Sequence, residues 1–175
     1  MSKFQKDNYL LVRNLITKKE AKTLAANLKK NEKNGLLDDP QVPQSVSFYN
    51  EKINTLLQKK LLPKIEKHTD FKLFKTYNYA RIYKKNAILR IHKDRPACEI
   101  SLTLDLGGDD WSIYLLNNDE KPIKVKLNSG DAIIYMGCDV WHWREKFKGN
   151  EHTQIFMHFV NKFGRYSWAK DDIQK

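Results

Sequence analysis

Residues 98–135 read CEISLTLDLGGDDWSIYLLNNDEKPIKVKLNSGDAIIY. This stretch holds four short apolar runs, and groups of glycine, asparagine and aspartate residues separate them. Short runs that are divided by turn-forming residues in this way are typical of strands in a β-sandwich or β-barrel. We therefore expect strands at residues 98–106, 111–116, 123–127 and 132–135.

The same pattern continues on both sides of this stretch. Further strand-like runs occupy residues 73–83, 88–92 and 153–160, and a short β-type run at 8–13 lies near the N-terminus. Between residues 13 and 73 the sequence instead has features of helices and loops, so the β-rich part of the chain follows a helical part.

Two helices are predicted in the first part of the chain. Thr17 and Glu20 have the spacing of a capping box, which marks a helix N-terminus. A second helix is expected over residues 50–67, where Pro63 should kink or restart it because proline has no N–H to donate. The apolar residues that we expect to face inward are Ala21, Leu24, Ala25 and Leu28 in the first helix, and Ile53, Leu56, Leu57 and Leu61 in the second.

The segment between these helices, residues 34–48, contains Gly35, Pro40 and Pro43 and is predicted to be a loop. A loop of this length in a compact domain is often a lid over a functional site. A plain connector explains the sequence equally well, and both interpretations stay open at this point.

The order of these elements predicts an α+β fold: a jelly-roll core with N-terminal helices packed on one sheet. We expect one domain over residues 1–175, because a chain of this length can bury a sizeable core. Within it, residues 8–67 would hold the supporting strand and helices, 71–161 the jelly-roll core, and 162–175 a C-terminal tail.

The composition excludes several classes of protein. Hydrophobic residues make up 41% of the chain, which argues against wholesale disorder. No apolar run approaches the roughly 20 residues that a membrane span needs, and the N-terminal residues do not resemble a signal peptide. Cys98 and Cys138 are the only cysteines, and reduced thiols are favoured over a disulfide. We therefore expect a cytoplasmic protein.

The chain carries a formal net charge of +11. A basic surface attracts anions, including nucleic acid. The lysines, however, are spread along the sequence in pairs, which is typical of solvated helix faces and loops. Nucleic-acid binding is therefore possible but not favoured.

His92 and Asp94 form a His-x-Asp pair at the end of a predicted strand, and His142 follows after a further 48 residues. Alternate residues on a strand point to the same side, so both side chains of the pair could reach one ion. Two imidazoles and one carboxylate can occupy one face of Fe(II) and leave the other positions open. The alternative is two ordinary histidines and an ion-paired aspartate; the context favours a metal site.

Further residues around the triad extend this pattern. They are Tyr83 with 84–87 before 89–94, then 101–104, Gly130-Asp131-Ala132, 142–145, Gly149 and 154–158. In these residues the chain resembles the Fe(II)/2-oxoglutarate-dependent dioxygenases, in particular the small prolyl-4-hydroxylase-like branch. The resemblance covers residues 77–160. It implies a double-stranded β-helix fold and an oxidoreductase that uses Fe(II), 2-oxoglutarate and O₂ to hydroxylate a substrate, with release of succinate and CO₂.

The resemblance also implies a partner for the distal carboxylate of 2-oxoglutarate, and here the chain departs from the family. Many relatives place Arg or Lys about ten residues after the distal histidine, whereas this chain has His152 and then Gln154. Because a buried unpaired carboxylate is costly, another group must serve. The candidates for the cosubstrate site are Tyr83, Arg144, Gln154, His152 and Arg81.

A substrate pocket is expected near the triad, and four residues are candidates for it. Arg95 follows Asp94 directly and could contact an anionic substrate or lie exposed in a loop. Trp111 and Trp143 could line the pocket, although core packing explains them better. His158 lies in an apolar strand and could face the pocket or be an ordinary core histidine.

Three functions remain open on this basis. The favoured one is a hydroxylase that acts on a peptidyl, prolyl-like or amino-acid-like substrate. The second is a nucleic-acid demethylase of the same chemistry, which the charge suggests. The third is a jelly-roll metal-binding module without activity. A halogenase is disfavoured, because that chemistry needs a small residue where Asp94 stands. The identity of the substrate and the oligomeric state do not follow from the sequence.

Overall fold

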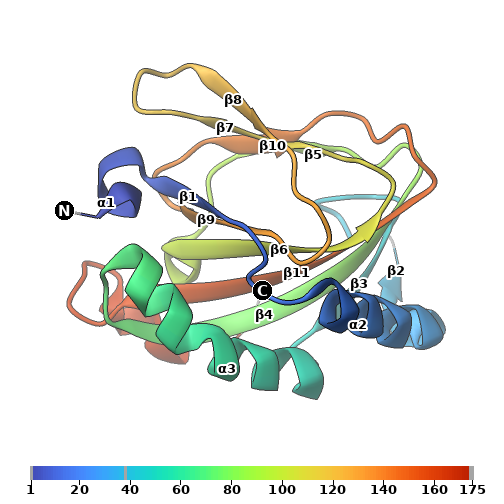
Figure 1. Cartoon of the computed structure of the whole chain (residues 1–175), viewed down its shortest axis with the longest axis horizontal. Helices are drawn as coiled ribbons and strands as arrows, with labels where there is room; N and C mark the ends of the chain where they lie inside the picture. Colours follow the sequence, from blue (N-terminus) through green and yellow to red (C-terminus); the bar gives the residue numbers. More distant parts are fainter. Residues whose placement is uncertain (1, 38, 174–175) are drawn as a thin grey trace.

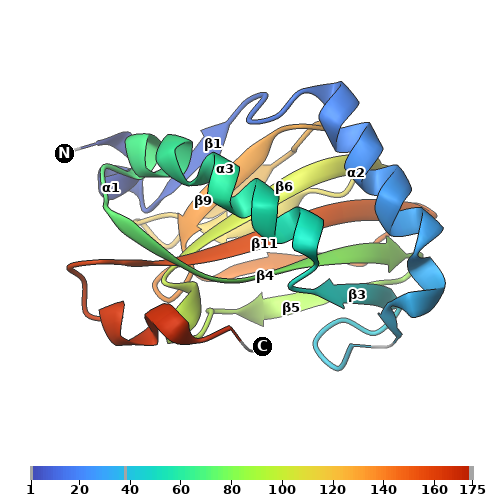
Figure 2. The ribbon, with the colours of Figure 1, turned by 90° about the horizontal axis from the view of Figure 1, so that it is seen from below.

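The structure, a computed structural model, describes residues 2–37 and 39–173. Its strands form two facing sheets, and the two longer helices cover the outer side of the larger one (Figures 1 and 2). The strands of the larger sheet are β1 (Tyr9–Val12), β2 (Leu36–Leu37), β3 (Ser45–Tyr49), β4 (Leu73–Lys84), β6 (Ile100–Gly108), β9 (Ala132–Met136) and β11 (Glu151–Asn161). Those of the smaller sheet are β5 (Leu89–His92), β7 (Ile113–Leu116), β8 (Pro122–Val125) and β10 (His142–Arg144).

The larger sheet has the strand order β1-β9-β6-β11-β4-β3-β2, and the smaller sheet has the order β5-β10-β7-β8. Neighbouring strands are antiparallel throughout both sheets. Two facing antiparallel sheets of this topology form a jelly roll, with helices on one side, so the predicted α+β fold class is confirmed. The predicted strands are all present within a few residues of their expected bounds, whereas β2, β3 and β10 had not been predicted.

The helices are α1 (Lys3–Asp7), α2 (Lys18–Lys30) and α3 (Lys52–Thr69), and the 3-10 helices are η1 (Glu32–Asn34), η2 (Pro96–Cys98) and η3 (Ser167–Asp171). The predicted capping box is present at α2: the Thr17 hydroxyl accepts from the Glu20 N–H at 3.1 Å, and the Glu20 carboxylate accepts from the Thr17 N–H at 2.9 Å. The predicted inward face of α2 is also confirmed, with Ala25 partly buried beside its buried neighbours.

The predicted inward stripe of α3 is wrong in its first half. Ile53 and Leu56 are 40% and 55% exposed, whereas Asn54 and Gln58 are buried against the sheet. The reason lies in a bulge between Met157 and Phe159, where β11 loses its regular pairing with β4. The Gln58 amide donates to the backbone carbonyl of His158 at 3.0 Å, so a polar side chain is needed where an apolar one was expected.

Pro63 was expected to kink α3 or restart it, but the helix continues to Thr69. A proline inside a helix removes one hydrogen bond, to the carbonyl four residues earlier. That carbonyl belongs to Lys59, which is exposed and open to water. The cost of the missing hydrogen bond is therefore small enough for the helix to run through.

Part of the predicted loop at residues 34–48 consists of strands. β3 pairs with β4 from Ser45 opposite Tyr83 to Tyr49 opposite Tyr79. Between β2 and β3, the described residues 39–44 cross the open end of the jelly roll, where Val42 is fully buried. The alternation in β3 was masked in the sequence by its two inward-facing polar residues, Ser45 and Ser47.

The two faces of the larger sheet differ in chemistry. Its outer face and the inward sides of the helices form one apolar cluster, which includes Ile82, Leu102 and Ile155. The inner face is largely polar although it is buried, and buried polar groups need partners. Its buried polar side chains include Ser45, Ser47, Tyr77, Tyr79, Arg81, Tyr83, Ser101, Thr103, Asp105, Tyr135, His152, Gln154 and His158. This concentration places a functional site between the two sheets.

The segment predicted as a tail packs on the core as far as residue 173. Ala169 in η3 is buried, and Asp172 forms an ion pair with Arg95. Residues 174–175 lie outside the described part of the chain. No helix among the described residues combines the length and the apolar character required to span a membrane.

Candidate metal centre and cosubstrate pocket

The three predicted metal ligands come together between the sheets. His92 ends β5 and His142 begins β10, and the two residues are directly paired across these neighbouring strands. Asp94 follows in the connection after β5, where its N–H donates to the carbonyl of Gly137 at 2.8 Å. Its Oδ1 lies 3.6 Å from Nε2 of each histidine, and one ligand atom from each residue lies within 4.8 Å of the others.

Both imidazoles are oriented by backbone carbonyls. Nδ1 of His92 lies 2.8 Å from the carbonyl oxygen of Arg90, and Nδ1 of His142 lies 3.0 Å from that of Val140. Because a carbonyl can only accept, each Nδ1 carries the hydrogen, and each Nε2 presents its lone pair. Both lone pairs belong to the atoms that face Asp94, as metal ligation requires.

The charge states also suit a cation. Burial acts to raise the pKa of Asp94, but the neighbouring His142 and the Ser101 hydroxyl outweigh it, so this pKa lies well below its usual range. Burial, together with the neighbouring His142, lowers the pKa of His92. A carboxylate beside two imidazoles is the donor set of the 2-His-1-carboxylate triad, so these residues fit Fe(II).

Gln41 contacts the triad from the connection between β2 and β3, and sequence reasoning had missed it. Its Nε2 lies 3.2 Å from Nε2 of His92, and its Oε1 accepts from Arg81 at 2.9 Å. Arg81 in turn forms a buried ion pair with Asp39, 2.9 Å long. One sign of this contact is present in the sequence, namely the polar residues Asp39 and Gln41 in a loop that contains prolines. Only the fold shows that they lie beside Arg81.

The position of Arg81 bears on its predicted role in holding 2-oxoglutarate. Its guanidinium already has the Asp39 carboxylate as a partner and donates through Nε to the Ser47 hydroxyl at 3.2 Å. A cation that is neutralised in this way attracts a second carboxylate weakly. Arg81 therefore holds the 39–44 segment, and its charge is less suited to the cosubstrate than that of Arg144.

Arg144 is a second fully buried cation between the sheets. It is 1% exposed, and its side chain lies on the same inward side of β10 as His142. Nη1 donates to the backbone carbonyl of Trp111, whereas Nε and Nη2 have no hydrogen-bond partner among residues 2–37 and 39–173. Burial lowers the pKa of this guanidinium, and no carboxylate of the described chain pairs with it. A buried cation with free donors is a site for an anion.

Tyr83 lies near the same guanidinium. The Tyr83 ring packs against Trp111 with centroids 4.8 Å apart, and the Arg144 guanidinium lies 5.0 Å from the centroid of Trp111. The Tyr83 hydroxyl lies close to Arg81 but completes no well-formed hydrogen bond. Gln154 is on β11, opposite Arg81 of β4, and both polar atoms of its carboxamide are buried without a partner in the described structure. Two polar side chains of the inner face thus have atoms free to bind a ligand.

His152 lies against an acidic and a carbonyl oxygen, although its Nε2 completes no well-formed hydrogen bond. Its Nδ1 lies 2.9 Å from the carbonyl of Asp109, and its Nε2 lies 3.1 Å from Oδ2 of Asp105. A second carboxylate placed at His152 would meet the charge of Asp105. The position at which many relatives carry a cation is therefore poorly suited to an anion in this chain.

The four residues proposed for the substrate pocket occupy different places. Arg95 is ion-paired with Asp172 and lies 4.9 Å from the centroid of the Tyr77 ring. Trp111 forms the wall beside Arg144. His158 faces the interior, where burial lowers its pKa to about 4. Trp143 points to the opposite side of β10 from the triad, because it alternates with His142 and Arg144, so the structure does not bring it to the pocket.

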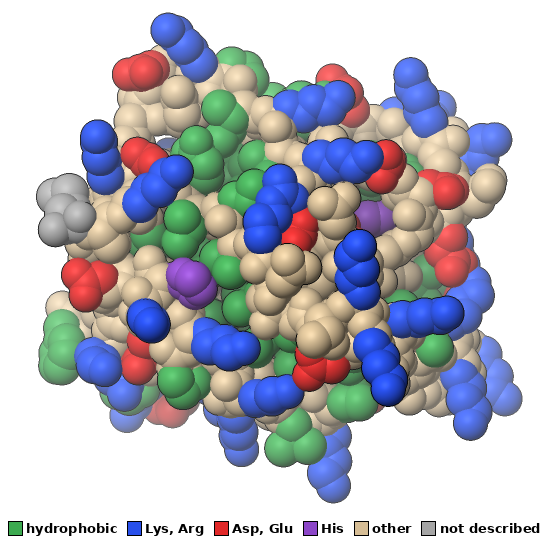
Figure 3. Space-filling view, viewed as in Figure 1, with side chains coloured by type: hydrophobic (Ala, Val, Ile, Leu, Met, Phe, Trp, Pro, Cys, Tyr) green, Lys and Arg blue, Asp and Glu red, His purple; other side chains and the backbone are tan. Residues whose placement is uncertain are grey.

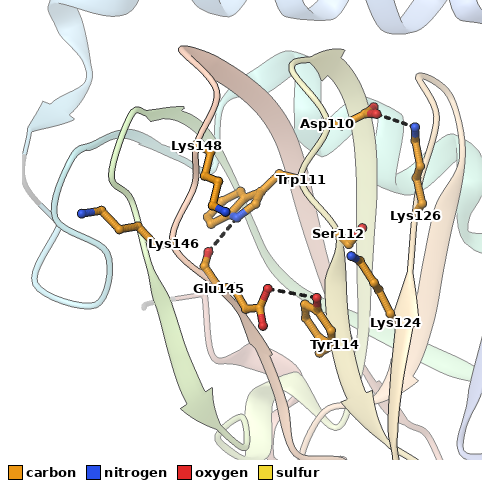
Figure 4. Close-up of a pocket in the computed structure, with 9 residues that line it drawn as sticks. All are labelled: Asp110, Trp111, Ser112, Tyr114, Lys124, Lys126, Glu145, Lys146 and Lys148. Atoms are coloured by element: carbon orange, nitrogen blue, oxygen red, sulfur yellow. Dashed lines mark hydrogen bonds and ion pairs between the residues drawn. The ribbon is translucent and has the colours of Figure 1, made fainter.

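On that opposite side, the smaller sheet carries an open groove of about 470 Å³ (Figure 4). Lys124 approaches it from β8, Lys126 from just after that strand, and Lys146 and Lys148 from the connection after β10. Lys126 pairs with Asp110, and Tyr114 donates to Glu145. Over the face seen in Figure 3, Lys and Arg side chains are scattered rather than gathered in one patch.

A second groove, of about 580 Å³, is lined by His92 of the triad. It lies between the 39–44 segment and β5, an edge strand of the smaller sheet. Its remaining lining residues are Pro40, Gln41, Pro43, Gln44, Asn86, Ile88 and Arg90. This groove is thus mostly uncharged, and a member of the triad borders it.

Comparisons with known proteins agree with this architecture. No family model matches the sequence. No curated protein matches it either. Among solved structures, a prolyl-4-hydroxylase of Pseudomonas putida is similar with a TM-score of 0.75 and 13% identity, over 90% of this chain and 95% of that one. The viral collagen prolyl hydroxylase of Paramecium bursaria Chlorella virus-1, in its 2-oxoglutarate complex, gives 0.66 and 12%, over 90% and 98%.

HygX of Streptomyces hygroscopicus, solved with nickel and 2-oxoglutarate bound, gives a TM-score of 0.71 and 13% identity, over 91% of this chain and 85% of that one. At such identities the likeness establishes the fold. The chain therefore has the jelly-roll fold of 2-oxoglutarate-dependent oxygenases, as its resemblance to that superfamily had implied.

Proposed function

We propose that this protein is an Fe(II)- and 2-oxoglutarate-dependent dioxygenase. The observation that carries the proposal is that Arg144 lies on the same side of β10 as the triad residue His142, two residues away. Its guanidinium is buried and has unused donors. His92, Asp94 and His142 would hold Fe(II). With 2-oxoglutarate and O₂, the metal would supply the oxidation that inserts one oxygen atom into the substrate and releases succinate and CO₂.

The protein residues would bind and orient the cosubstrate. Nε and Nη2 of Arg144 would pair with the distal carboxylate of 2-oxoglutarate, an arrangement that a guanidinium can make bidentate. The Tyr83 hydroxyl and the Gln154 amide would donate to the same carboxylate. Trp111 lies against Arg144 and Tyr83 and would keep water away from this charge pair.

The proposed substrate is peptidyl, prolyl-like or amino-acid-like. The groove that His92 borders supports this class, because three carboxamides line it and Arg90 is its only lysine or arginine. The carboxamides of Gln41, Gln44 and Asn86 can donate to and accept from backbone amide groups. The P. putida and viral structures are named as prolyl hydroxylases, whereas HygX was solved with hygromycin B, so the fold itself serves more than one substrate class.

The test is turnover of 2-oxoglutarate by purified protein with Fe(II). We expect the visible charge-transfer band of an Fe(II)–2-oxoglutarate complex under anaerobic conditions, and succinate formation in air that a peptide substrate stimulates. The matched control is His92→Ala, which should abolish both signals. Well-folded protein that binds the metal yet forms no succinate with any substrate would support a metal-binding module instead.

The alternative, a nucleic-acid demethylase, is favoured by one feature: the lysine-lined groove on the smaller sheet, beside the stacked rings of Tyr114 and Trp143. None of the triad residues lines that groove, which argues for the peptidyl class. Affinity for single-stranded oligonucleotides that falls steeply with salt, together with succinate formation on a methylated strand, would favour the demethylase.

A further inference from the structure

Behind the metal centre, three side chains form a chain of hydrogen bonds. The Ser101 hydroxyl lies 2.6 Å from Oδ2 of Asp94 and 3.0 Å from Nδ1 of His158. Ser101 on β6 and His158 on β11 are directly opposite each other in the pairing of these strands. Ser101 is fully buried and His158 is 3% exposed. The contacts are therefore closed to solvent and fixed by the sheet.

The donor and the acceptor in each of these hydrogen bonds follow from the hydrogens that Ser101, Asp94 and His158 can carry. The Ser101 hydroxyl has one hydrogen, and the ionised Asp94 carboxylate can only accept. The carbonyl of Cys98, at 3.2 Å, is a second and more distant acceptor. The hydroxyl therefore donates to the carboxylate. Its oxygen then faces Nδ1 of His158 with lone pairs, so Nδ1 must carry the hydrogen and donate to Ser101.

The ring of His158 is held in place from three sides. It packs on the rings of Tyr77 and Tyr79, with centroids 4.7 and 5.6 Å away. Its backbone carbonyl lies at the β11 bulge and accepts from the Gln58 amide of α3 at 3.0 Å. The ring therefore has little freedom to turn its Nδ1 away from Ser101.

We propose that His158 and Ser101 are positioning residues for the metal, acting through Asp94. By holding Oδ2, they leave Oδ1 as the atom that faces Nε2 of His92 and His142, each 3.6 Å away. A carboxylate fixed in this way binds a metal through one oxygen and leaves the remaining coordination positions free. Partners that orient a ligand are worth about 10- to 100-fold in metal affinity. This inference rests on the proposed function.

A competing interpretation is a second metal site, because ligand atoms of Asp94, Cys98 and His158 also lie within 4.8 Å of one another. The geometry favours positioning over ligation. The nitrogen of His158 that points to this cluster is the one that donates to Ser101, and the Cys98 sulfur is in contact with the Tyr77 hydroxyl at 3.0 Å. The two interpretations differ in the number of ions bound.

The experiment compares His158→Asn with His158→Gln in the full chain. The Asn amide nitrogen occupies the place of Nδ1 and keeps a donor toward Ser101, whereas the longer Gln side chain places its amide nitrogen near the Nε2 position. Co(II) affinity is measured by calorimetry without 2-oxoglutarate, and the visible spectrum of bound Co(II) reports the coordination. Circular dichroism and thermal unfolding check the fold of each variant, and Ser101→Ala provides a second route to the same contact.

We expect His158→Gln and Ser101→Ala to bind Co(II) roughly 10- to 100-fold more weakly with an altered spectrum, and His158→Asn to stay within about 3-fold of the wild type. Equal affinities for the Asn and Gln variants, or an unchanged Ser101→Ala protein, would overturn the proposal. Binding of two Co(II) ions, one lost in His158→Asn, would replace it with the second-site interpretation. If the wild type binds no Co(II) while His92→Ala behaves identically, the proposed function itself fails.

Discussion

Arg144 lies two residues beyond His142 on β10, and both side chains enter the space between the two sheets. One strand therefore contributes a metal ligand and an unpaired guanidinium to the same pocket. A cosubstrate with one chelating end and one carboxylate end, which is the chemistry of 2-oxoglutarate, matches this arrangement.

Replacing Arg144 tests this arrangement. Arg144→Met keeps much of the apolar volume but removes the charge, so the distal carboxylate would be buried without a cation. We expect the KM for 2-oxoglutarate to rise on the order of 100-fold, which corresponds to about 3 kcal/mol, with Co(II) affinity unchanged. Initial rates of succinate formation measure it. If the KM for 2-oxoglutarate is unaltered in Arg144→Met but raised in His152→Leu, the residue that binds the distal carboxylate lies on β11 instead.

Most strands and the pair of His92 and Asp94 could be predicted from the sequence because each depends on short-range patterns, whereas His142 was expected beside this pair from the resemblance to a family. His92 and Asp94 are two residues apart at a strand end, and turn-forming residues mark the strand boundaries. The choice among the candidate anchors could not be made, because it depends on which cation already has a partner. Asp39 pairs with Arg81 across a separation of 42 residues, and only the fold shows that Arg144 lacks such a partner.

The inward face of α3 was mispredicted for a related reason. Its Gln58 serves a backbone carbonyl at a bulge in β11, and a bulge leaves no mark in the sequence of the helix that covers it. Apolar periodicity finds the residues that fill a core, but it misses polar residues that satisfy a buried backbone group.

The ion pair of Asp39 and Arg81 should be important for stability. Both side chains are at most 2% exposed, so Asp39→Asn would leave a buried guanidinium without its counter-charge. We expect the free energy of unfolding to fall by about 3–5 kcal/mol. Tyr49→Phe removes a hydrogen bond to the same carboxylate but leaves the charge pair in place, and should cost about 1 kcal/mol. Urea unfolding of both variants measures the difference, and equal losses would show that the charge pair adds nothing to the hydrogen bond.

Asp131 gives a pH dependence whose sign can be worked out. Burial acts to raise its pKa, but the N–H groups of Asn14 and Asn128 and the guanidinium of Arg13 outweigh it and lower the pKa. A carboxyl with a lowered folded-state pKa stabilises the fold above its unfolded value of about 3.9, and this contribution is lost as the pH falls through the lower folded value. Asp131→Asn should therefore unfold more easily at neutral pH and converge on the wild type in acid. Asp171→Asn, at an exposed site, serves as the control. If the free energies of unfolding of Asp131→Asn and the wild type change with pH in the same way, Asp131 is not the group responsible for this pH dependence.

Gly137 should be required because a side chain here would meet the proposed metal centre and the backbone beside it. A Cβ at this position would lie 2.3 Å from the carbonyl oxygen of Cys98, 2.5 Å from Oδ2 of Asp94 and 2.7 Å from the Ser101 hydroxyl. Since such contacts do not occur, Gly137→Ala must displace the Cys98 carbonyl together with the carboxylate and its hydroxyl partner. We expect Co(II) affinity to fall by at least about 10-fold, the range seen when a ligand loses its orienting partner. Calorimetry measures the affinity, and circular dichroism confirms that the variant is folded. A folded alanine variant that binds Co(II) with wild-type affinity and spectrum would show that the carboxylate tolerates displacement, and with it that the contact between Ser101 and Asp94 has no part in metal binding.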